Sequence, residues 1–142
     1  MLRSKKVFIG SSVFYAFIDR GHPKHAQAEA FFRYYAQESF QLYTSLPEVI
    51  STHENLQKNV GYATARDFLR TVFLGNIEVI YPEESETKNA LKLALAGSGS
   101  SQAVTFEQAL SNTISDKRRI PQIASFDYSQ FYFGIEPFTL PY

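Results

Sequence analysis

The sequence contains no cysteine and no tryptophan, and it has only one methionine. Without cysteine the protein can form no disulfide, no thiolate zinc site and no cysteine nucleophile. No stretch of the chain approaches the ~20 consecutive apolar residues that a membrane span requires. The apolar run 7–9 ends at Gly10 and is too short for a secretion signal. We therefore expect a cytoplasmic protein that has no membrane partner.

An excess of charge of either sign is lacking as well. The 14 Lys and Arg residues balance the 14 Asp and Glu residues, so the formal net charge is zero at pH 7. A protein that holds nucleic acid through a broad positive field neutralises many phosphates with Lys and Arg. The charge balance argues against that class of protein and leaves room only for a local basic patch.

What is present is apolar and aromatic material for one core. The 142 residues are 44% hydrophobic and 15% aromatic, with 13 Phe and 9 Tyr. A chain of this length buries roughly 70% of its unfolded surface, so it needs no disulfide or metal to fold. The sequence contains no repeat, and the glycine- and serine-rich segment 97–101 is typical of a loop within a domain. We expect a single domain over residues 1–142.

Short apolar runs alternate with amphipathic segments along the chain. Apolar runs bounded by Gly, Pro, Ser or Asp are typical of buried strands. Longer segments with apolar residues at helical spacing are typical of helices. We expect strands at 6–9, 41–44, 77–81 and 121–126, and helices at 13–18, 23–37, 46–58, 62–74, 85–96 and from a cap at 105 to about 116–119.

Capping patterns mark where several of these helices begin. Small hydroxyl side chains satisfy the free N–H groups of a first turn, and proline is tolerated there because it has no N–H. A Ser or Thr followed three residues later by Glu or Gln forms a capping box. The expected signals are Ser11 or Ser12 as the first cap, Pro23 as the first residue of the second helix, Ser45 with Glu48 for the third, and Thr105 with Gln108 for the last.

Strands that alternate with helices favour parallel pairing, with helices on both faces of the sheet. We therefore expect an α/β fold, a three-layer α/β/α sandwich with a short parallel sheet. In such a sheet the ligand crevice lies beyond the carboxyl ends of the strands. The residues at those ends are Gly10, Ser11, Thr44, Ser45 and Asp127.

The residues at these strand ends resemble one known family of domains. Their order and spacing agree with that family from residue 6 to about 138, which is nearly the whole chain. The segments that carry the likeness are VFIGSSVFYAFIDRGHPKHAQA, YTSLPEVISTHENL, VTFEQALSNTI and IASFDYSQFYFGI. Together they resemble PIN domains of the VapC-like type, which share the PilT N-terminal-like nuclease fold.

The resemblance implies a nuclease whose acidic side chains hold Mg²⁺ or Mn²⁺, because hard cations take oxygen ligands. The family has an acid at four positions, and these are Gly10, Ser51, Gln108 and Asp127 here. Only Asp127 is still acidic. We therefore expect a degenerate acidic site with no cofactor, in which these four positions and Ser11 form the substrate-binding crevice.

Neighbouring acids are candidate substitutes for the lost ligands. Glu48 and Glu54 lie one turn either side of Ser51 on the expected helix. Glu107 adjoins Gln108, but adjacent helix positions point about 100° apart, so we expect Glu107 to aim elsewhere. If the site is active, Asp127 would hold Mg²⁺ or Mn²⁺ together with Glu48 or Glu54.

Three hypotheses for the function stay open at this point. The first is a PIN-like protein related to metal-dependent endoribonucleases of toxin–antitoxin pairs, which does not cleave and acts by binding RNA or a protein partner. The second is an active endoribonuclease that uses Asp127 with Glu48 or Glu54. The third is a dimeric protein-interaction module without nucleic acid. The resemblance implies a homodimer and a small antitoxin-like partner that wraps the groove near the helical pair 46–74.

Overall fold

A computed structural model describes residues 4–96, 104–127 and 136–141. Its centre is a parallel sheet of five strands in the order β3-β2-β1-β4-β5. The segment 97–101 and the part of the last family-like segment that follows residue 127 lie outside the described residues. The strands are β1 (Lys6–Ile9), β2 (Gln41–Ser45), β3 (Ile77–Ile80), β4 (Gln122–Ala124) and β5 (Glu136–Pro137).

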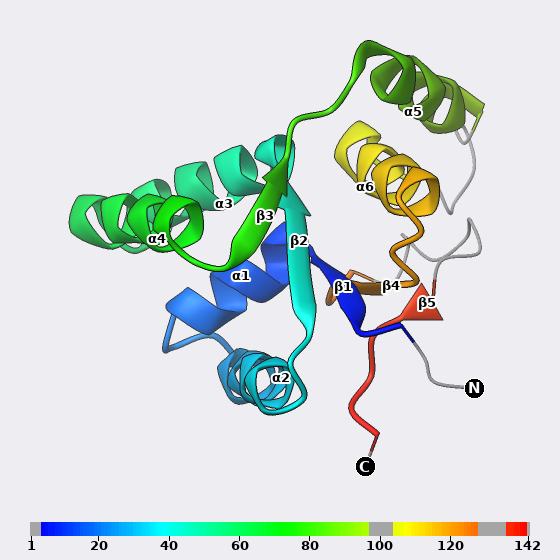
Figure 1. Ribbon diagram of the computed structural model, residues 1–142. Coiled ribbons are helices and arrows are strands. Elements are labelled where there is room, and N and C mark those ends of the chain that lie inside the picture. The colour runs from blue at the N-terminus through cyan, green and yellow to red at the C-terminus, as the bar shows by residue number, and fades with distance from the viewer. Residues whose placement is uncertain (1–3, 97–103, 128–135, 142) are drawn as a thin grey trace.

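Helices cover both faces of this sheet (Figure 1). One apolar cluster joins the first four helices to one face, and a second cluster joins the last two helices to the other. The expected three-layer α/β/α fold is therefore confirmed. None of the described helices combines the length and the apolar character of a bilayer-spanning helix. The helices are α1 (Ser11–Ile18), α2 (His25–Gln37), α3 (Leu46–Asn59), α4 (Tyr62–Leu74), α5 (Glu84–Ala96) and α6 (Phe106–Lys117).

Strand β1 is the central strand and is buried on both sides. Val7 and Ile9 pack into the cluster with α1 to α4, and Phe8 packs into the cluster with α5 and α6. All three side chains are fully inaccessible to solvent. Successive side chains of a strand point to opposite faces. A continuous apolar run is therefore what a strand in the middle layer requires.

The sequence located four strands and missed the fifth. Strand β5 has only two residues, one of which is Pro137, and such a segment carries no strand pattern. Strand β4 is shorter than the expected 121–126. Its end is set by Ser12, whose hydroxyl accepts the Phe126 N–H at 2.9 Å and draws the chain away from the sheet.

Two of the expected helix starts are wrong. Gly10, not Ser11 or Ser12, is the N-cap of α1, and both serines lie inside the helix. Helix α2 begins at His25 rather than at Pro23. The Nδ1 atom of His22 accepts the Lys24 N–H at 3.0 Å and holds a separate turn there, which delays the helix.

Two other caps lie where they were expected. The Thr105–Gln108 capping box is confirmed: the Thr105 hydroxyl accepts the Gln108 N–H and the Gln108 Oε1 accepts the Thr105 N–H, both at 3.0 Å. Ser45 is the N-cap of α3, but its side chain makes no capping hydrogen bond. Glu48 does not fold back onto this cap because its carboxyl group points to other partners, described below.

The order of the strands places a crevice between β1 and β4. From β1 the chain builds β2 and β3 on one side and then returns to place β4 and β5 on the other. Crossovers that leave β1 in opposite directions open a crevice at the carboxyl ends of the two strands. There the Gly10 N–H donates to the Ala124 carbonyl at 2.9 Å.

A buried ion pair joins the two helices of the outer layer. The Glu86 carboxylate at the start of α5 is 1% exposed and accepts from the Arg118 guanidinium and from the Glu83 N–H. A second pair, between Lys117 and Glu83, lies beside it with both side chains exposed. Of these two ion pairs, only Glu86–Arg118 contains a buried charge, the Glu86 carboxylate, which would lose its counter-ion if the pair were broken.

We expect Arg118→Met to destabilise the protein because it leaves the Glu86 carboxylate buried without its counter-ion. Loss of one partner of a buried pair lowers the free energy of unfolding by about 2 to 4 kcal/mol. Lys117→Met is the matched control, because an exposed pair contributes little. Urea denaturation of both variants measures the difference. Equal losses in the two variants would contradict a special role for the buried pair.

Candidate functional site

A small cavity of about 170 Å³ opens beyond the carboxyl ends of β1 and β4. It contains the sequence-predicted residues Gly10, Ser11, Gln108 and Asp127, and within residues 4–96, 104–127 and 136–141 no lysine, arginine or histidine lines it. Three of its walls are helix starts, those of α1, α3 and α6. The lining is Gly10, Ser11, Ser12, Glu48, Thr105, Glu107, Gln108, Ser125 and Asp127.

Glu48 supplies a buried carboxyl group to this cavity. Glu48 is only 2% exposed to solvent. Its Oε2 accepts the Ser11 N–H at 2.6 Å, and its Oε1 accepts the Ser111 hydroxyl at 2.6 Å. Burial raises the pKa of the Glu48 carboxyl above its usual range, and the hydrogen bonds from Ser111 and Ser11 act in the opposite direction. Each of the two carboxyl oxygens of Glu48 thus accepts a hydrogen bond from another part of the protein.

Gln108 occupies the cavity as a neutral amide. Its Oε1 belongs to the capping box of α6, and its Nε2 donates to the Asp127 carboxylate. The Asp127 N–H in turn donates to the Ser125 hydroxyl at 3.0 Å. The capping box thus fixes the side chain that holds Asp127, the one acid retained at the four family-like positions.

Glu107 also lines the cavity, so the expectation that it aims elsewhere is wrong. Because α6 starts at the crevice, neighbouring side chains of its first turn reach the same cavity from different angles. Burial and, to a smaller extent, the Glu48 charge raise the pKa of the Glu107 carboxyl, a hydrogen bond from Ser51 lowers it, and the net result is a pKa of about 7. Its Oε1 has no hydrogen-bond partner among the described residues.

The structure places Ser51 and Glu54 outside the lining of the cavity. Helix α3 begins at the crevice and runs away from it, so its first turn brings Glu48 to the cavity. Ser51 lies one turn further on and meets the site through Glu107. Glu54 lies two turns from Glu48 and is exposed. Helical spacing alone could not show how far along α3 the cavity extends.

The residues described do not fit the divalent metal that the resemblance implies. Mg²⁺ and Mn²⁺ need several carboxylate or carbonyl oxygens that are free to coordinate. Here both oxygens of Glu48 accept hydrogen bonds and Asp127 accepts one from Gln108, while Glu107 offers one oxygen without a partner among the described residues, which is too few for such an ion. Within residues 4–96, 104–127 and 136–141 there is no group of three or more His, Asp or Glu side chains placed to hold a metal ion.

We expect Glu48→Ala to lower the free energy of unfolding by about 2 to 4 kcal/mol, because it leaves the Ser11 N–H and the Ser111 hydroxyl buried without an acceptor. Glu54→Ala, a change of the same residue type on an exposed part of α3, should alter stability by less than about 0.5 kcal/mol. Urea denaturation compares the two variants. Similar effects would mean that the Glu48 hydrogen bonds carry no net stability.

The stability is expected to fall as the pH rises from about 4.5 to about 7. The pKa of the Glu107 carboxyl rises from 4.5 to about 7 on folding, so the folded state binds this proton more tightly and ionisation opposes folding. Compared with Glu107→Gln, the unmodified protein should lose about 1 to 2 kcal/mol above pH 7 and little below pH 4.5, after allowance for solvent screening. Denaturation of both proteins across this range measures the loss. If the difference in the free energy of unfolding between the two proteins did not change with pH, the predicted effect of Glu107 ionisation would be ruled out.

No protein-family model and no curated protein matches the sequence of this chain. Among solved structures, it is similar to the sarcin-ricin loop cleaving toxin VapC20 of Mycobacterium tuberculosis, with a TM-score of 0.81 and 18% identity over 94% of this chain and 99% of that one.

Two further solved structures are similar to this chain in fold. VapBC2 from Rickettsia felis, bound to a DNA fragment from its promoter, matches with a TM-score of 0.70 and 10% identity over 93% of this chain and 96% of that one. PAE2754 from Pyrobaculum aerophilum matches with a TM-score of 0.61 and 14% identity over 88% and 82%. All three have PIN-type folds. With identities this low the likeness concerns the fold alone, and the chain therefore has the PIN-type fold of VapC-like proteins.

Proposed function

We propose that this protein is a PIN-fold protein with a degenerate acidic site, which does not cleave RNA and acts by binding a small protein partner of the antitoxin type. The observation that carries the proposal is the bond from the Gln108 amide to the Asp127 carboxylate. An amide donor stands here where the resemblance implies a second acid. The Gln108 amide supplies the Asp127 carboxylate with a hydrogen-bond donor from the protein itself. A second carboxylate at this position would repel Asp127 unless a cation lay between them.

The other acids of the cavity support the same proposal. Both carboxyl oxygens of Glu48 are committed to hydrogen bonds from Ser11 and Ser111, so neither is left free to coordinate a metal ion. At Gly10 a Cβ atom would lie 3.2 Å from the Ala124 carbonyl oxygen. An aspartate would fit there only if β1 and β4 moved apart by a few tenths of an ångström. The close contact of the two strands thus disfavours the lost acid at that position.

The charge of the cavity favours a protein partner over RNA. Glu48, Glu107 and Asp127 line it, and none of the described residues that line it is basic. Phosphate groups are bound by Lys and Arg, and without a metal an acidic cavity repels them. The formal net charge of zero adds no general attraction.

Exposed apolar side chains on the helical pair supply a surface for that partner. Among the described residues, nine large hydrophobic side chains are exposed, and five of them lie on α3, on α4 or at the turn between them. Tyr62 is 77% exposed and Leu74 is 85% exposed. Phe68 and Val72, by contrast, are core residues. The five are Ile50, Val60, Tyr62, Phe73 and Leu74.

We expect the purified protein to leave a structured RNA uncut in the presence of Mg²⁺ or Mn²⁺, since no carboxylate cluster is free to coordinate the ion. Gel assays with Asp127→Asn as the matched control measure cleavage above background. Metal-dependent cleavage that is lost in Asp127→Asn would overturn the proposal and favour the active endoribonuclease. Cleavage that persists in that variant would point to a contaminating nuclease, and a repeat on further purified protein would then decide.

We expect the protein to form a stable complex with the product of a small neighbouring reading frame when the two are co-expressed. Tyr62→Ser and Leu74→Ser together, at the two ends of α4, should weaken the complex at least about tenfold, as loss of apolar interface contacts does. Leu95→Ser, on the exposed side of α5, is the matched control. Light scattering and calorimetry measure the complex. A dimer of this chain that the same two changes disrupt would instead favour the dimeric module.

A further inference from the structure

The two edge strands of the sheet differ in how well they are protected. β5, at one edge, has only two residues, and one of them is Pro137, which has no backbone N–H to offer to a further strand. β3, at the other edge, has the sequence IEVI, which contains neither the lysine nor the proline that keeps other chains away from an exposed strand. Figure 1 shows β3 at the end of the sheet beside β2. The β3 edge is therefore open to another strand in a way that the β5 edge is not.

The backbone of β3 is hydrogen-bonded on one side only. Its residues pair with β2 in a parallel register that runs from Leu42–Ile77 to Ser45–Ile80. In the part of the chain that the structure describes, residues 77–81 have no backbone-to-backbone hydrogen bond beyond this ladder. The N–H and C=O groups on the outer side are thus left to solvent. A row of such donors and acceptors is matched by another extended polypeptide chain.

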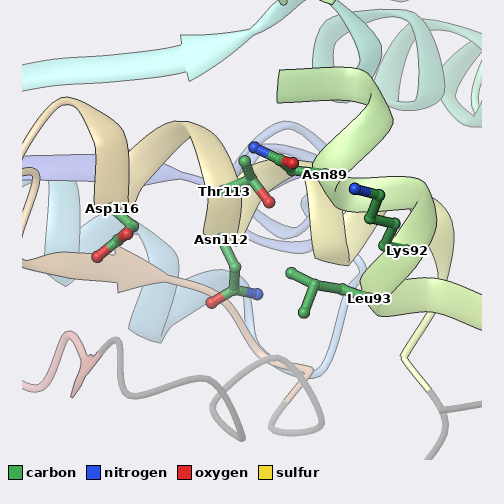
Figure 2. Close-up of a pocket in the computed structure, with 6 residues that line it drawn as sticks. All are labelled: Asn89, Lys92, Leu93, Asn112, Thr113 and Asp116. Carbon is green, nitrogen blue, oxygen red and sulfur yellow. The ribbon is translucent and has the colours of Figure 1, made fainter. Parts of the chain in front are cut away.

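The helices before and after β3 in the chain do not cover this edge. α4 packs its buried residues into the apolar cluster on one face of the sheet. α5 turns towards α6 instead. Figure 2 shows Asn89 and Leu93 of α5 directed towards α6, where they line a cavity of about 460 Å³ between the two helices.

Side chains along the edge are accessible as well. Glu78 is exposed and forms no ion pair within the described ranges. Tyr81, the residue directly after β3, is 62% exposed. Ile77 and Val79 are half-buried on the face that packs with α1 to α4. The edge thus combines unpaired backbone groups with apolar side chains and a single charge.

We propose that a second copy of this chain occupies the edge. The β3 strands of two copies pair antiparallel with Val79 opposite Val79, so that the sheets join into one sheet with five strands from each copy. A two-fold axis makes this interface self-complementary, because both copies supply the same groups. Residues that face each other in an antiparallel pair point to the same face of the sheet. The helices α1 to α4 of both copies therefore lie on one side of the joined sheet.

The side chains of β3 select this register. If Glu78 stood at the centre, two like charges would face each other, which is destabilising. If the centre lay two residues after Glu78, that residue would face Pro82, which has no N–H for the ladder. With Val79 at the centre, the two valines face each other and Ile77 faces the exposed Tyr81 of the other copy. Pairs of aromatic and β-branched side chains across antiparallel strands are favourable.

The test introduces one cysteine into a chain that has none. In Val79→Cys the two facing Cβ atoms would be about 5 Å apart, close enough for a disulfide after a small adjustment. Tyr81→Cys is the matched control: its side chain is more exposed, yet the two copies of residue 81 would be about 14 Å apart, four residues along the strands. Under mild oxidation Val79→Cys should form the covalent dimer at least about tenfold faster than Tyr81→Cys. Non-reducing gels measure both rates.

A second variant tests the interface without a covalent bond. Tyr81→Lys places a charge opposite Ile77 of the other copy and should weaken the dimer at least about tenfold. The side chain is exposed, so the variant should unfold like the unmodified protein. Leu95→Lys, on the exposed part of α5, is the matched control and should dimerise normally. Light scattering over a range of concentrations measures the dimer.

Three results would overturn the inference. One is an unmodified protein that stays monomeric up to about 1 mM. Another is cross-linking of Tyr81→Cys as fast as that of Val79→Cys, which would indicate random collision or a different register. The third is a monomer whose β3 amides become protected from hydrogen exchange only in a complex with a different protein, which would assign the edge to that protein.

The inference does not depend on the proposed function. The combined Tyr62→Ser and Leu74→Ser changes, which test the surface of α3 and α4, should leave the Val79→Cys cross-link in place. RNA cleavage is measured separately from the dimer. Failure of the β3 dimer would therefore leave the proposed function standing, and the reverse holds as well.

Discussion

The buried carboxyl group of Glu48 joins three segments that are far apart in the sequence. It accepts hydrogen bonds from the first residue of α1 and from the middle of α6, while it stands on the first turn of α3. These helix starts surround the crevice at the ends of β1 and β4. In a site that depends on a metal, a cation holds such segments together through their acids. Here one acid does so through hydrogen bonds to neutral donors.

The chemistry of the rest of the cavity depends on that arrangement. With Glu48 fixed and buried, the neighbouring Glu107 holds its proton up to about pH 7. Asp127 is held by Gln108, whose other amide atom caps α6. A network satisfied in this way is rigid, because each member would leave a partner unpaired if it moved. It is also acidic without being rich in free metal ligands, which is why we propose a protein partner rather than a phosphate substrate.

The outer layer carries a separate set of polar groups. The Glu86–Arg118 pair fixes one end of α5 against α6. Further along the same helices, the Oδ1 atom of Asn112 is buried without a hydrogen-bond partner among the described residues. The two helices are thus joined by a satisfied polar contact at one end, whereas a buried polar atom further along has no partner among the described residues.

The sequence by itself determined the layers, the parallel sheet and four of the crevice positions. Apolar runs located β1 to β4, the capping box located α6, strand ends located Gly10, Ser11 and Asp127, and the family resemblance added Gln108. It did not determine that Glu48 and Glu107 would reach the cavity while Ser51 and Glu54 would not, nor that β5 would form. Helical periodicity tells which side chains share a face, but how far along its axis each helix meets the crevice is set by packing on the sheet. Only the tertiary structure decided which acids meet, and therefore which of them carry a proton and which accept a hydrogen bond.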